Sequence, residues 1–279
     1  MIPSVTLCCG LSIPTVGFGT YKAGEPAVLT EAIRAGYRMF DSASFYQTEK
    51  PLGEAVRQSG MNRGDFFITT KLWKEDMGYR SAKEACGRSL AALGMEYADL
   101  YLIHWPKPTH DYREWRSLIR DTWRAMEELC RGGFVRAVGV SNFLPHHLEA
   151  LLENAQTVPA VNQIEFHPGY TQWSTVDYCR SHSITVQAWS PLGRTRMLDD
   201  PLLVEIAENH GVSPAQICLR FAYEEGVIPL PKASSPERMR ENLDLFAFSL
   251  TAEERMRLAS MPPAGWSGEH PDRPRVYFS

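Results

Sequence analysis

The chain has 279 residues, of which 44% are hydrophobic and 22% are charged, and its formal net charge at pH 7 is −4. This balance argues against a nucleic-acid partner, and no apolar run approaches the roughly 18 residues that predict a membrane span. The opening "MIPSVTLCCG" lacks the charged and then apolar stretch of a secretory signal. We therefore expect a cytoplasmic, monomeric protein with no nucleic-acid or membrane partner.

Residues 3–14 have the pattern of a β-hairpin that turns at Cys9–Gly10, and residues 15–19 follow as a strand. Beyond them, helical spacing of apolar residues alternates with short apolar runs. Pro26 near the start and Gly36 at the end bound the first predicted helix. Further strands are predicted at 39–42, 66–71, 99–104, 135–141, 161–165, 184–190 and 227–231. Further helices are predicted at 49–60, before Gly94, and at 119–130, 145–154, 173–182, 202–225 with a break near Gly211, 236–243 and 252–260.

This alternation amounts to eight strand–helix units, which implies parallel strands joined by helical crossovers. Eight units in about 240 residues fit a closed barrel. We therefore predict an α/β fold, a (β/α)8 TIM barrel with an N-terminal β-hairpin and a C-terminal extra helix and tail, as a single domain over residues 1–279. A dinucleotide-binding Rossmann fold is the alternative, but in "GFGTYKAG" the third glycine comes too late for the G-x-G-x-x-G motif.

The polar residues of interest lie at the C-terminal ends of the predicted strands, where barrels of this kind carry their chemistry. They are Thr20, Tyr21, Asp41, Lys71, His104, Ser141, Asn142, Gln163, Glu165, Trp189, Ser190 and Lys232. Asp41, Lys71 and His104 follow one another at intervals of 30 and 33 residues, one strand–helix unit each, and so share one rim. A single such residue is usually structural, but a buried Lys71 and a buried Asp41 are costly unless they pair. Tyr46, five residues beyond Asp41, can reach over the same mouth.

Seven stretches of the chain carry a family resemblance. They are "GYRMFDSASFYQTEKPLGEAV", "TTKLW", "YLIHWP", "VGVSNF", "VNQIEFHP", "WSPLG" and "PKASSPERMRENL", and together they resemble the aldo-keto reductase superfamily, colinearly and nearly from end to end. Within it the chain is most similar to bacterial 2,5-diketo-gluconate reductase-like members, because Trp189 stands where many animal members have tyrosine. The resemblance implies the barrel fold and NAD(P)H-dependent reduction of an aldehyde or ketone to an alcohol.

The chemistry of this reaction suggests roles for four of the strand-end residues. Negative charge grows on the carbonyl oxygen and a proton must arrive, here from a phenol whose ordinary pKa is near ~10. Lys71 beside the hydroxyl of Tyr46 would favour the phenolate and lower that pKa. Asp41 would anchor Lys71, and His104 would donate a hydrogen bond to the carbonyl oxygen. We therefore expect Asp41, Tyr46, Lys71 and His104 to be catalytic, with Tyr46 as the proton donor.

NADPH is the expected cofactor, with NADH as an alternative. The resemblance implies that Ser141, Asn142 and Gln163 bind the nicotinamide carboxamide and that Trp189 stacks under the ring. Gly193 would permit close backbone approach to the pyrophosphate. The predicted cofactor-binding set is Thr20, Tyr21, Asp41, Ser141, Asn142, Gln163, Trp189, Ser190, Leu192, Gly193, Arg194, Lys232, Ala233, Ser234, Arg238, Glu241 and Asn242.

The stretch "PKASSPERMREN" is predicted to begin a helix that Ser235 caps, and free N–H groups at such a helix start favour an anion. Lys232 and Arg238 add positive charge, which suits the 2′-phosphate of NADPH. The family commonly has Ser or Thr directly after this lysine, whereas this chain has Ala233. One hydrogen bond to the phosphate is therefore missing unless Ser234 supplies it.

The predicted substrate pocket is apolar and aromatic. Its expected residues are Tyr21, Tyr46, Trp73, His104, Trp105 and, from the C-terminal tail, Trp266. Long insertions that would narrow the mouth are missing from the sequence, so we expect an open pocket with a broad preference for small or medium carbonyl compounds. Core packing accounts equally well for any one of these aromatic residues alone.

No metal site is expected, because the histidines show neither an H-E-x-x-H motif nor clustered spacing. We expect His146, His147, His167, His182 and His210 to lie on the surface or in loops. The six cysteines lack C-x-x-C spacing, so we expect free thiols that mostly pack as small apolar groups.

Two other functions compete with carbonyl reduction. Lys71 could form a Schiff base with a carbonyl substrate, as lysines of some barrel enzymes do. Alternatively, the chain could be a regulatory protein that binds the cofactor without catalysis, as some relatives of aldo-keto reductases are. The complete set of Asp41, Tyr46, Lys71 and His104 favours an active reductase.

Overall fold

The computed structural model describes residues 2–275, and its centre is an eight-stranded parallel sheet in which sequence neighbours pair in order from β3 to β10. The two end strands are β3 (Phe18–Gly19) and β10 (Val227–Pro229). The N–H of Gly17 donates to the carbonyl of Pro229 (3.1 Å), and the N–H of Gly19 donates to the carbonyl of Pro231 (3.0 Å). These bonds join the two ends of the sheet, and the predicted (β/α)8 barrel is confirmed.

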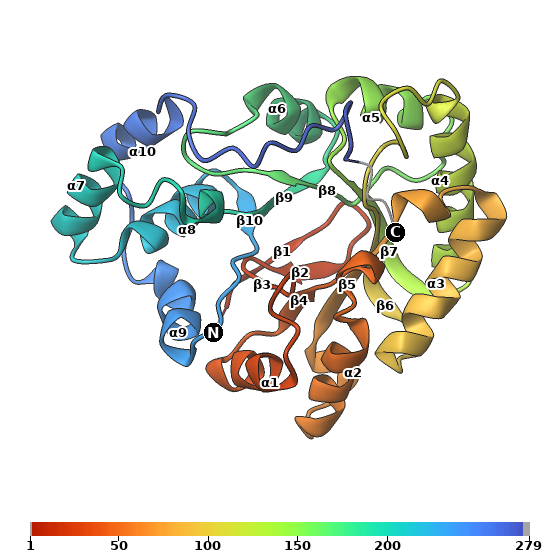
Figure 1. Cartoon of the computed structure of the whole chain (residues 1–279), viewed down its shortest axis with the longest axis horizontal. Coiled ribbons are helices and arrows are strands. Elements are labelled where there is room, and N and C mark those ends of the chain that lie inside the picture. The colour runs from red at the N-terminus through yellow and green to blue at the C-terminus, as the bar shows by residue number, and fades with distance from the viewer. Residues whose placement is uncertain (1, 276–279) are drawn as a thin grey trace.

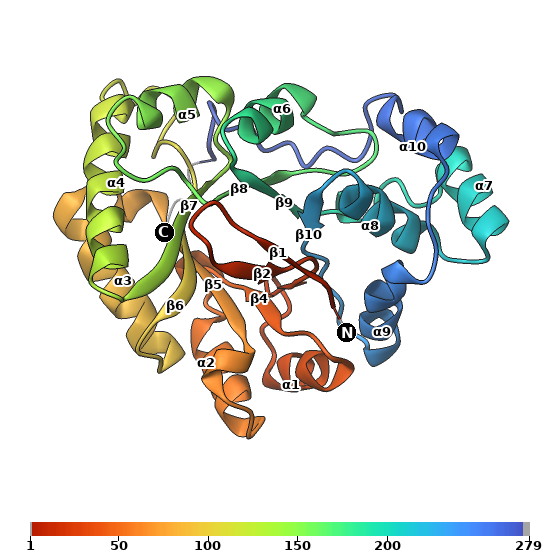
Figure 2. The same cartoon turned by 180° about the vertical axis from the view of Figure 1, so that it is seen from behind.

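Figures 1 and 2 show the strands at the centre and the helices around them. The strands between the two ends are β4 (Met39–Asp41), β5 (Phe67–Leu72), β6 (Ala98–Ile103), β7 (Val135–Ser141), β8 (Val161–Glu165) and β9 (Thr185–Trp189). The α-helices are α1 (Pro26–Ala35), α2 (Glu49–Gln58), α3 (Tyr79–Leu93), α4 (Trp115–Arg131), α5 (Pro145–Leu152), α6 (Trp173–Ser181), α7 (Pro201–His210), α8 (Pro214–Glu224), α9 (Pro236–Leu243) and α10 (Ala252–Ala259). Short 3-10 helices, which the sequence pattern did not predict, include η1 (Ser44–Tyr46) and η4 (Gly193–Thr195).

The predicted break near Gly211 separates α7 from α8. Gly211 ends α7 in the left-handed region, at φ 64°, where its missing side chain avoids strain. Ser213 then caps α8, because its hydroxyl accepts the N–H of Gln216, and Pro214 occupies the first turn. One long helical pattern therefore folds as two helices.

The N-terminal hairpin closes the lower end of the barrel, as Figure 2 shows from that side. Its strands β1 (Ser4–Thr6) and β2 (Ser12–Pro14) pair antiparallel, and Gly10 turns the chain at φ 85°. Leu7 and Ile13 are buried against side chains that fill the barrel interior, among them Met39 and Leu100. The predicted hairpin is confirmed, and it acts as an apolar floor.

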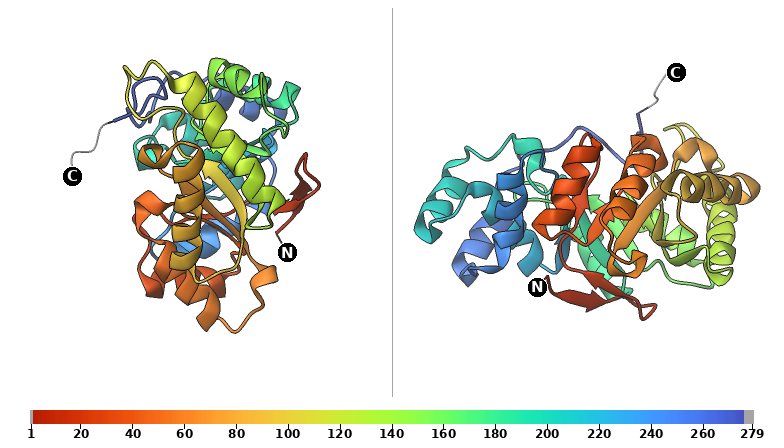
Figure 3. Two further views of the ribbon diagram at one scale, coloured as in Figure 1. Left: turned by 90° about the vertical axis from the view of Figure 1, so that its right-hand side faces the viewer. Right: turned by 90° about the horizontal axis from the view of Figure 1, so that it is seen from below.

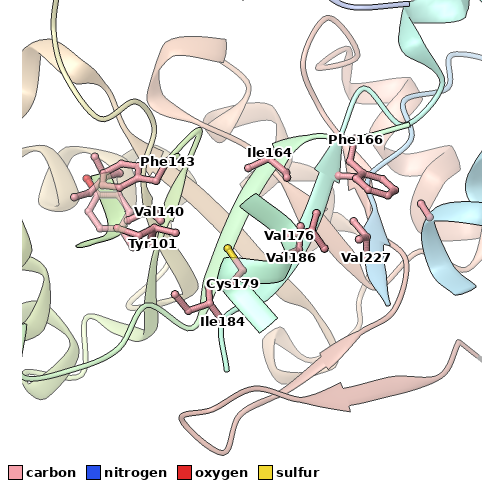
Figure 4. Close-up of a cluster of buried hydrophobic side chains, with 14 of the residues drawn as sticks. Tyr101, Val140, Phe143, Ile164, Phe166, Val176, Cys179, Ile184, Val186 and Val227 are labelled. Atoms are coloured by element: carbon pink, nitrogen blue, oxygen red, sulfur yellow. The ribbon is translucent and has the colours of Figure 1, made fainter. Parts of the chain in front are cut away.

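The main core lies between the outside of the barrel and the surrounding helices. Figure 4 shows one part of it, where Val176 and Cys179 of α6 pack with Val186 of β9 and Val227 of β10. Of the six described cysteines, none is in a disulfide, and Cys86, Cys179 and Cys218 are buried as small apolar groups. Within residues 2–275 the structure contains no helix with the length and hydropathy to span a membrane.

The segment after α10, residues 260–275, runs across the upper end of the barrel, opposite the hairpin. The left view of Figure 3 shows the hairpin on one side and the segment leading to the C-terminus on the other. We call residues 262–275 the tail. Hydrogen bonds fasten it, including those from Ser267 to Glu165 and from Lys74 to the carbonyl of Arg275.

The fold predicts opposite effects for two glycines in neighbouring helices. An ideal Cβ on Gly53 of α2 would lie 1.8 Å from the carbonyl oxygen of Leu93, at the end of α3. Gly53→Ala must therefore push α2 and α3 apart, and we expect it to lower the free energy of unfolding by about 1–3 kcal/mol. Gly87 of α3 has no atom within 4 Å of its Cβ position and is the matched control.

Gly87→Ala is expected to raise the free energy of unfolding by about 0.5–1 kcal/mol, because alanine lowers the entropy of the unfolded chain. Urea unfolding followed by far-ultraviolet circular dichroism measures both variants. Equal destabilisation by the two substitutions would contradict the close approach of α2 and α3.

Candidate active site

Lys71 is the buried charge around which the upper end of the barrel is built. It lies near the end of β5 without solvent contact, and its Nζ donates to Asp41 Oδ2 on the neighbouring strand β4 over 2.6 Å. Nζ also donates to the carbonyl of Ser42 (3.1 Å) and to the hydroxyl of Tyr46 (3.3 Å). The sequence prediction that Lys71 pairs with Asp41 is confirmed.

Asp41 uses its second oxygen to bind the opposite side of the barrel. Gln163 of β8 donates from Nε2 to Asp41 Oδ1 (2.8 Å) and also reaches Gln187 of β9 (3.1 Å). Burial lowers the pKa of Lys71, and the charge of Asp41 opposes that shift. The carboxylate is therefore what favours the ammonium form of Lys71.

Tyr46 reaches Lys71 because the chain makes a tight turn directly after β4. The 3-10 helix η1 ends at Tyr46, and Gln47 follows in the left-handed region at φ 57°. Ser44 Oγ donates to the carbonyl of Lys71 (3.1 Å), which ties η1 to β5. The Tyr46 ring then lies 4.8 Å from Lys71 Nζ and 4.9 Å from the ring of Tyr21.

His104 follows β6 and meets Tyr46 from the other side. Its Nε2 lies 3.3 Å from the hydroxyl oxygen of Tyr46. Its backbone is fixed by Asn142, whose Nδ2 donates to the His104 carbonyl (3.0 Å). Burial holds the pKa of His104 well below its ordinary value, and the nearby charge of Lys71 adds to this effect. The imidazole is therefore neutral at physiological pH.

A cavity of about 580 Å³ opens above these groups. Its lining includes the predicted catalytic residues Asp41, Tyr46 and His104 and the predicted substrate residues Tyr21, Trp73 and Trp105. From the predicted cofactor set it includes Tyr21, Asp41, Ser141, Asn142, Gln163, Trp189, Ser190, Leu192, Arg194 and Lys232. Residues at or after the ends of all eight strands, β3 to β10, thus share one space.

Other predicted residues lie outside the cavity lining. Thr20 is buried, and its hydroxyl binds Thr48 (2.7 Å) and the carbonyl of Asp41 (3.0 Å). Trp266 is 42% exposed, packs 6.1 Å from the ring of Tyr170, and donates from Nε1 to the carbonyl of Glu269. The remaining residues of this kind are Lys71 beneath the lining, Gly193 in η4, Ala233 and Ser234 before α9, Arg238 in the first turn of α9, and Glu241 and Asn242 in its last turn.

The cavity also contains residues that the sequence analysis missed. Phe45 stacks on Trp73 with ring centroids 3.9 Å apart. The tail contributes Glu269 and Arg275, which form an ion pair of 3.2 Å. Phe45 could have been found from its place beside Tyr46, whereas no local pattern marks the two tail residues. The other missed lining residues are Gly19, Lys22, Pro191, Thr195 and Leu230.

The loop after β9 is strained and carries a cationic side chain at the border of the cavity. Ser190, Gly193, Arg194 and Thr195 all have positive φ, between 48° and 65°. Each non-glycine residue in this left-handed backbone conformation costs roughly 1–2 kcal/mol, a strain that is typical of functional loops. The N–H groups of Gly193 and Thr195 already donate to carbonyls within the loop, over 2.9 and 2.8 Å, so the cationic side chain of Arg194 is what suits an anion. The loop borders the cavity and carries Arg194, so it could hold a cofactor phosphate.

The histidines include one grouping that the sequence did not predict. His146, His147 and the tail residue Asp272 place their ligand atoms within 4.8 Å of one another. The expectation of a surface or loop position is wrong for His147, which is buried in α5 because it accepts the Leu144 N–H that begins the helix. That bond puts the His147 proton on Nε2, and Lys107 lies 3.2 Å from Asp272 Oδ1. Both features oppose a metal ion at this grouping.

Comparison with known proteins gives a consistent result. A model described as "Aldo/keto reductase family" matches residues 16–261. The chain is 41% identical to glyoxal reductase of Bacillus subtilis (strain 168) over 96% of each chain, and 38% identical to morphine 6-dehydrogenase of Pseudomonas putida over 92% of this chain and 90% of that one. A crystal structure of a mutant of Gox0644 in complex with NADPH has a TM-score of 0.90 at 34% identity, covering 99% of this chain and 100% of that one.

The site predicts an unusual titration of His104. At about pH 6.5, where an ordinary histidine is half protonated, the His104 imidazole should remain neutral, because burial and Lys71 both disfavour its charge. Lys71→Met removes one of these causes and should raise the pKa of His104. Nitrogen-15 NMR across a pH series measures this, with the signal assigned by its loss in His104→Gln. An ordinary titration of His104 in the wild type would refute the described environment.

Proposed function

The chain belongs to the aldo/keto reductase family, and from this premise we propose that it reduces small aldehydes and ketones to alcohols, with NADPH as cofactor and Tyr46 as proton donor. Members of this family are NAD(P)H-dependent oxidoreductases. One observation carries the assignment: the hydroxyl of Tyr46 lies 3.3 Å from the ammonium of Lys71 and 3.3 Å from His104 Nε2, at the edge of an open cavity. A phenol placed in this way can donate a proton to a carbonyl oxygen.

Lys71 makes Tyr46 a better acid. The bound nicotinamide would supply a hydride to the carbonyl carbon, so that negative charge grows on the oxygen. A nearby ammonium favours the phenolate over the phenol, so Tyr46 can release its proton to the growing alkoxide more readily. Asp41 holds Lys71 in its charged form and in place, 2.6 Å away. Proton transfer from a positioned acid typically contributes ~10²–10⁴ in rate.

His104 acts as a hydrogen-bond donor in this proposal. Its low pKa leaves no proton to give up at neutral pH, so the imidazole is a poor general acid. Its Nδ1 is buried without a hydrogen-bond partner among the described residues. A proton there would be an unsatisfied buried donor, so the Nε2–H tautomer is favoured. Nε2–H can then orient the carbonyl and stabilise the growing negative charge beside Tyr46.

The residues around the cavity fit a nicotinamide ring. Gln163 is held through Nε2, whereas its Oε1 forms no hydrogen bond within residues 2–275 and can accept the carboxamide N–H. Trp189 donates from Nε1 to Asn142 Oδ1 (2.8 Å), which fixes its indole at the cavity wall as a surface for stacking. Ser141 lies between Gln163 and Asn142 and bonds both. These groups would bind the ring.

The phosphates would lie toward the loop after β9 and the start of α9. Arg194 and Lys232 line the cavity, and Ser235 caps α9 by accepting the N–H of Arg238. Lys232, Ser234 and Arg238 are exposed and can reach a 2′-phosphate, whereas Ala233 is buried and offers no hydroxyl. This donor set supports NADPH as the preferred cofactor, with NADH used less well.

Small carbonyl compounds are the proposed substrates. Tyr21, Phe45, Trp73 and Trp105 give the cavity aromatic walls. Relatives named glyoxal reductase and morphine 6-dehydrogenase act on compounds of very different size, so a broad panel is needed. Because Trp189 also suggests 2,5-diketo-gluconate reductase-like members, the panel should include a diketo sugar acid beside glyoxal and p-nitrobenzaldehyde.

Neither rival function gains support from the geometry. A Schiff-base lysine must reach the substrate, but Lys71 lies under the cavity lining with Nζ bonded to Asp41, Ser42 and Tyr46. A regulatory protein needs no aligned proton donor. The mutual hydrogen bonds of Lys71, Tyr46 and His104 support an active reductase.

Tyr46→Phe is expected to lower kcat by about 10²–10⁴-fold, because it removes the proton donor and little else. NADPH binding, measured by quenching of protein fluorescence, should remain near the wild-type value. Tyr21→Phe is the matched control: its ring lies in the same cavity, yet its hydroxyl forms no hydrogen bond to Lys71 or His104, and it should lose less than about tenfold in kcat. Full activity of Tyr46→Phe would eliminate Tyr46 as donor.

Lys232→Ala is expected to raise KM for NADPH by about 10–100-fold, the loss that follows removal of one charge-assisted hydrogen bond to a phosphate. KM for NADH should change less than threefold, because NADH has no 2′-phosphate. Steady-state assays with one aldehyde and both cofactors measure the difference. An equal effect on both cofactors would show that Lys232 does not recognise the 2′-phosphate.

A further inference from the structure

Glu165 is a buried carboxylate that the proposed chemistry does not use. It ends β8 within the stretch "VNQIEFHP" and is 2% exposed. Its two oxygens accept the N–H (2.8 Å) and the hydroxyl (2.7 Å) of Ser267, which lies 102 residues further along the chain, in the tail. A strand end at the catalytic rim is thus bonded directly to the tail.

The bonds from Ser267 are what make this buried charge tolerable. Removing a carboxylate from water costs several kcal/mol unless hydrogen bonds compensate it. Nε2 of His167 lies 3.5 Å from Oε1 and has no hydrogen-bond partner in the described chain. Because Ser267 supplies both hydrogen bonds to this carboxylate within the described residues, breaking them would leave the charge of Glu165 uncompensated, and this cost holds the tail in place.

The tail leads from Ser267 to the cavity in two residues. Ser267 Oγ accepts the N–H of Glu269 (3.1 Å), and Trp266 Nε1 donates to the Glu269 carbonyl (3.2 Å). These bonds fix the backbone of Glu269, whose carboxylate pairs with Arg275 over 3.2 Å. Both charged side chains line the cavity, whose other walls include the aromatic residues described above.

Further buried side chains hold the far end of the tail. Lys74, 1% exposed, donates to the carbonyls of Arg275 (2.6 Å) and Pro108 (2.8 Å). Lys107 lies 3.2 Å from Asp272 Oδ1. The chain around the Glu269–Arg275 pair is therefore held by three anchors: Glu165 before Glu269, and Lys107 and Lys74 after it.

We propose that Glu165 is a positioning residue that, through Ser267, holds the Glu269–Arg275 pair as the polar wall of the substrate cavity. This inference rests on the proposed function and adds a substrate class to it. A carboxylate and a guanidinium supply an acceptor and donors in the same cavity as the aromatic side chains of Tyr21, Trp73 and Trp105. They suit carbonyl compounds that carry hydroxyl groups next to the reacting carbon, such as glyceraldehyde, more than wholly apolar aldehydes.

The test compares three variants of the full-length protein. Glu165→Ala removes both bonds to Ser267. Glu165→Gln is the conservative variant, because its amide can still accept the Ser267 N–H and donate to Oγ. Glu127→Ala is the matched control: Glu127 is also buried and accepts two backbone N–H groups, those of Gln156 (2.7 Å) and Thr157 (2.8 Å), but it lies on α4 away from the cavity.

Two measurements are made on each variant. Hydrogen–deuterium exchange read by mass spectrometry reports the tail amides of residues 262–275 and needs no catalysis. Steady-state kinetics with NADPH give kcat and KM for glyceraldehyde and for p-nitrobenzaldehyde. For Glu165→Ala we expect at least tenfold faster exchange in the tail, about tenfold higher KM for glyceraldehyde, and less than threefold change in KM for p-nitrobenzaldehyde and in kcat. Glu165→Gln should remain near wild type in all of these.

The inference is overturned if Glu165→Ala leaves tail exchange and both KM values unchanged. It is equally overturned if Glu127→Ala raises KM for glyceraldehyde as much, since the effect would then be general destabilisation. If Glu165→Ala fails to fold, Glu269→Gln tests the polar wall by the same KM comparison, and equal KM values for the wild type and that variant reject it. If the wild-type protein oxidises no NADPH with any carbonyl compound, the proposed function is refuted. Hydrogen–deuterium exchange of the tail in Glu165→Ala then still tests whether Glu165 holds the tail.

Discussion

An ammonium group without solvent contact requires an anion, and the upper end of this barrel is built around that requirement. Lys71 has no exposed surface, so Asp41 must lie within bonding distance of it, and it does so at 2.6 Å. Asp41 in turn is held by Gln163 from the opposite side of the barrel. The pair therefore places a positive charge 3.3 Å from the hydroxyl of Tyr46, a residue that also lines the open cavity.

The rest of the fold keeps that arrangement rigid at both ends of the barrel. Leu7 and Ile13 of the hairpin fill the lower end with apolar side chains, so that the strands have a packed interior beneath the charged pair. The upper end is walled by the tail, which is tied down by buried charged side chains such as Glu165 and Lys74. The cost of an unpaired buried charge thus holds both the Lys71–Asp41 pair beneath the cavity and the tail at its wall.

Much of this architecture could be predicted from the sequence, and the limits are physical. Asp41, Lys71 and His104 recur once per strand–helix unit, and parallel strands bring such residues together, so their convergence followed from spacing alone. The pairing of Glu269 with Arg275, and their place in the cavity, follow from the path of the tail over the barrel, which no periodic pattern encodes. The burial of His147 was not predicted for a similar reason. It depends on the hydrogen bond from the Leu144 N–H to His147 Nδ1 at the start of α5, which no periodic pattern encodes.

The most direct test of the account is a crystal structure of the protein with NADPH and an unreactive carbonyl or carboxylate analogue of the substrate. The account predicts that one oxygen of the analogue lies about 2.6–3.2 Å from both the hydroxyl of Tyr46 and Nε2 of His104, with Lys71 still bonded to Asp41. An analogue oxygen bonded to neither group, in a cavity that holds the nicotinamide elsewhere, would contradict it.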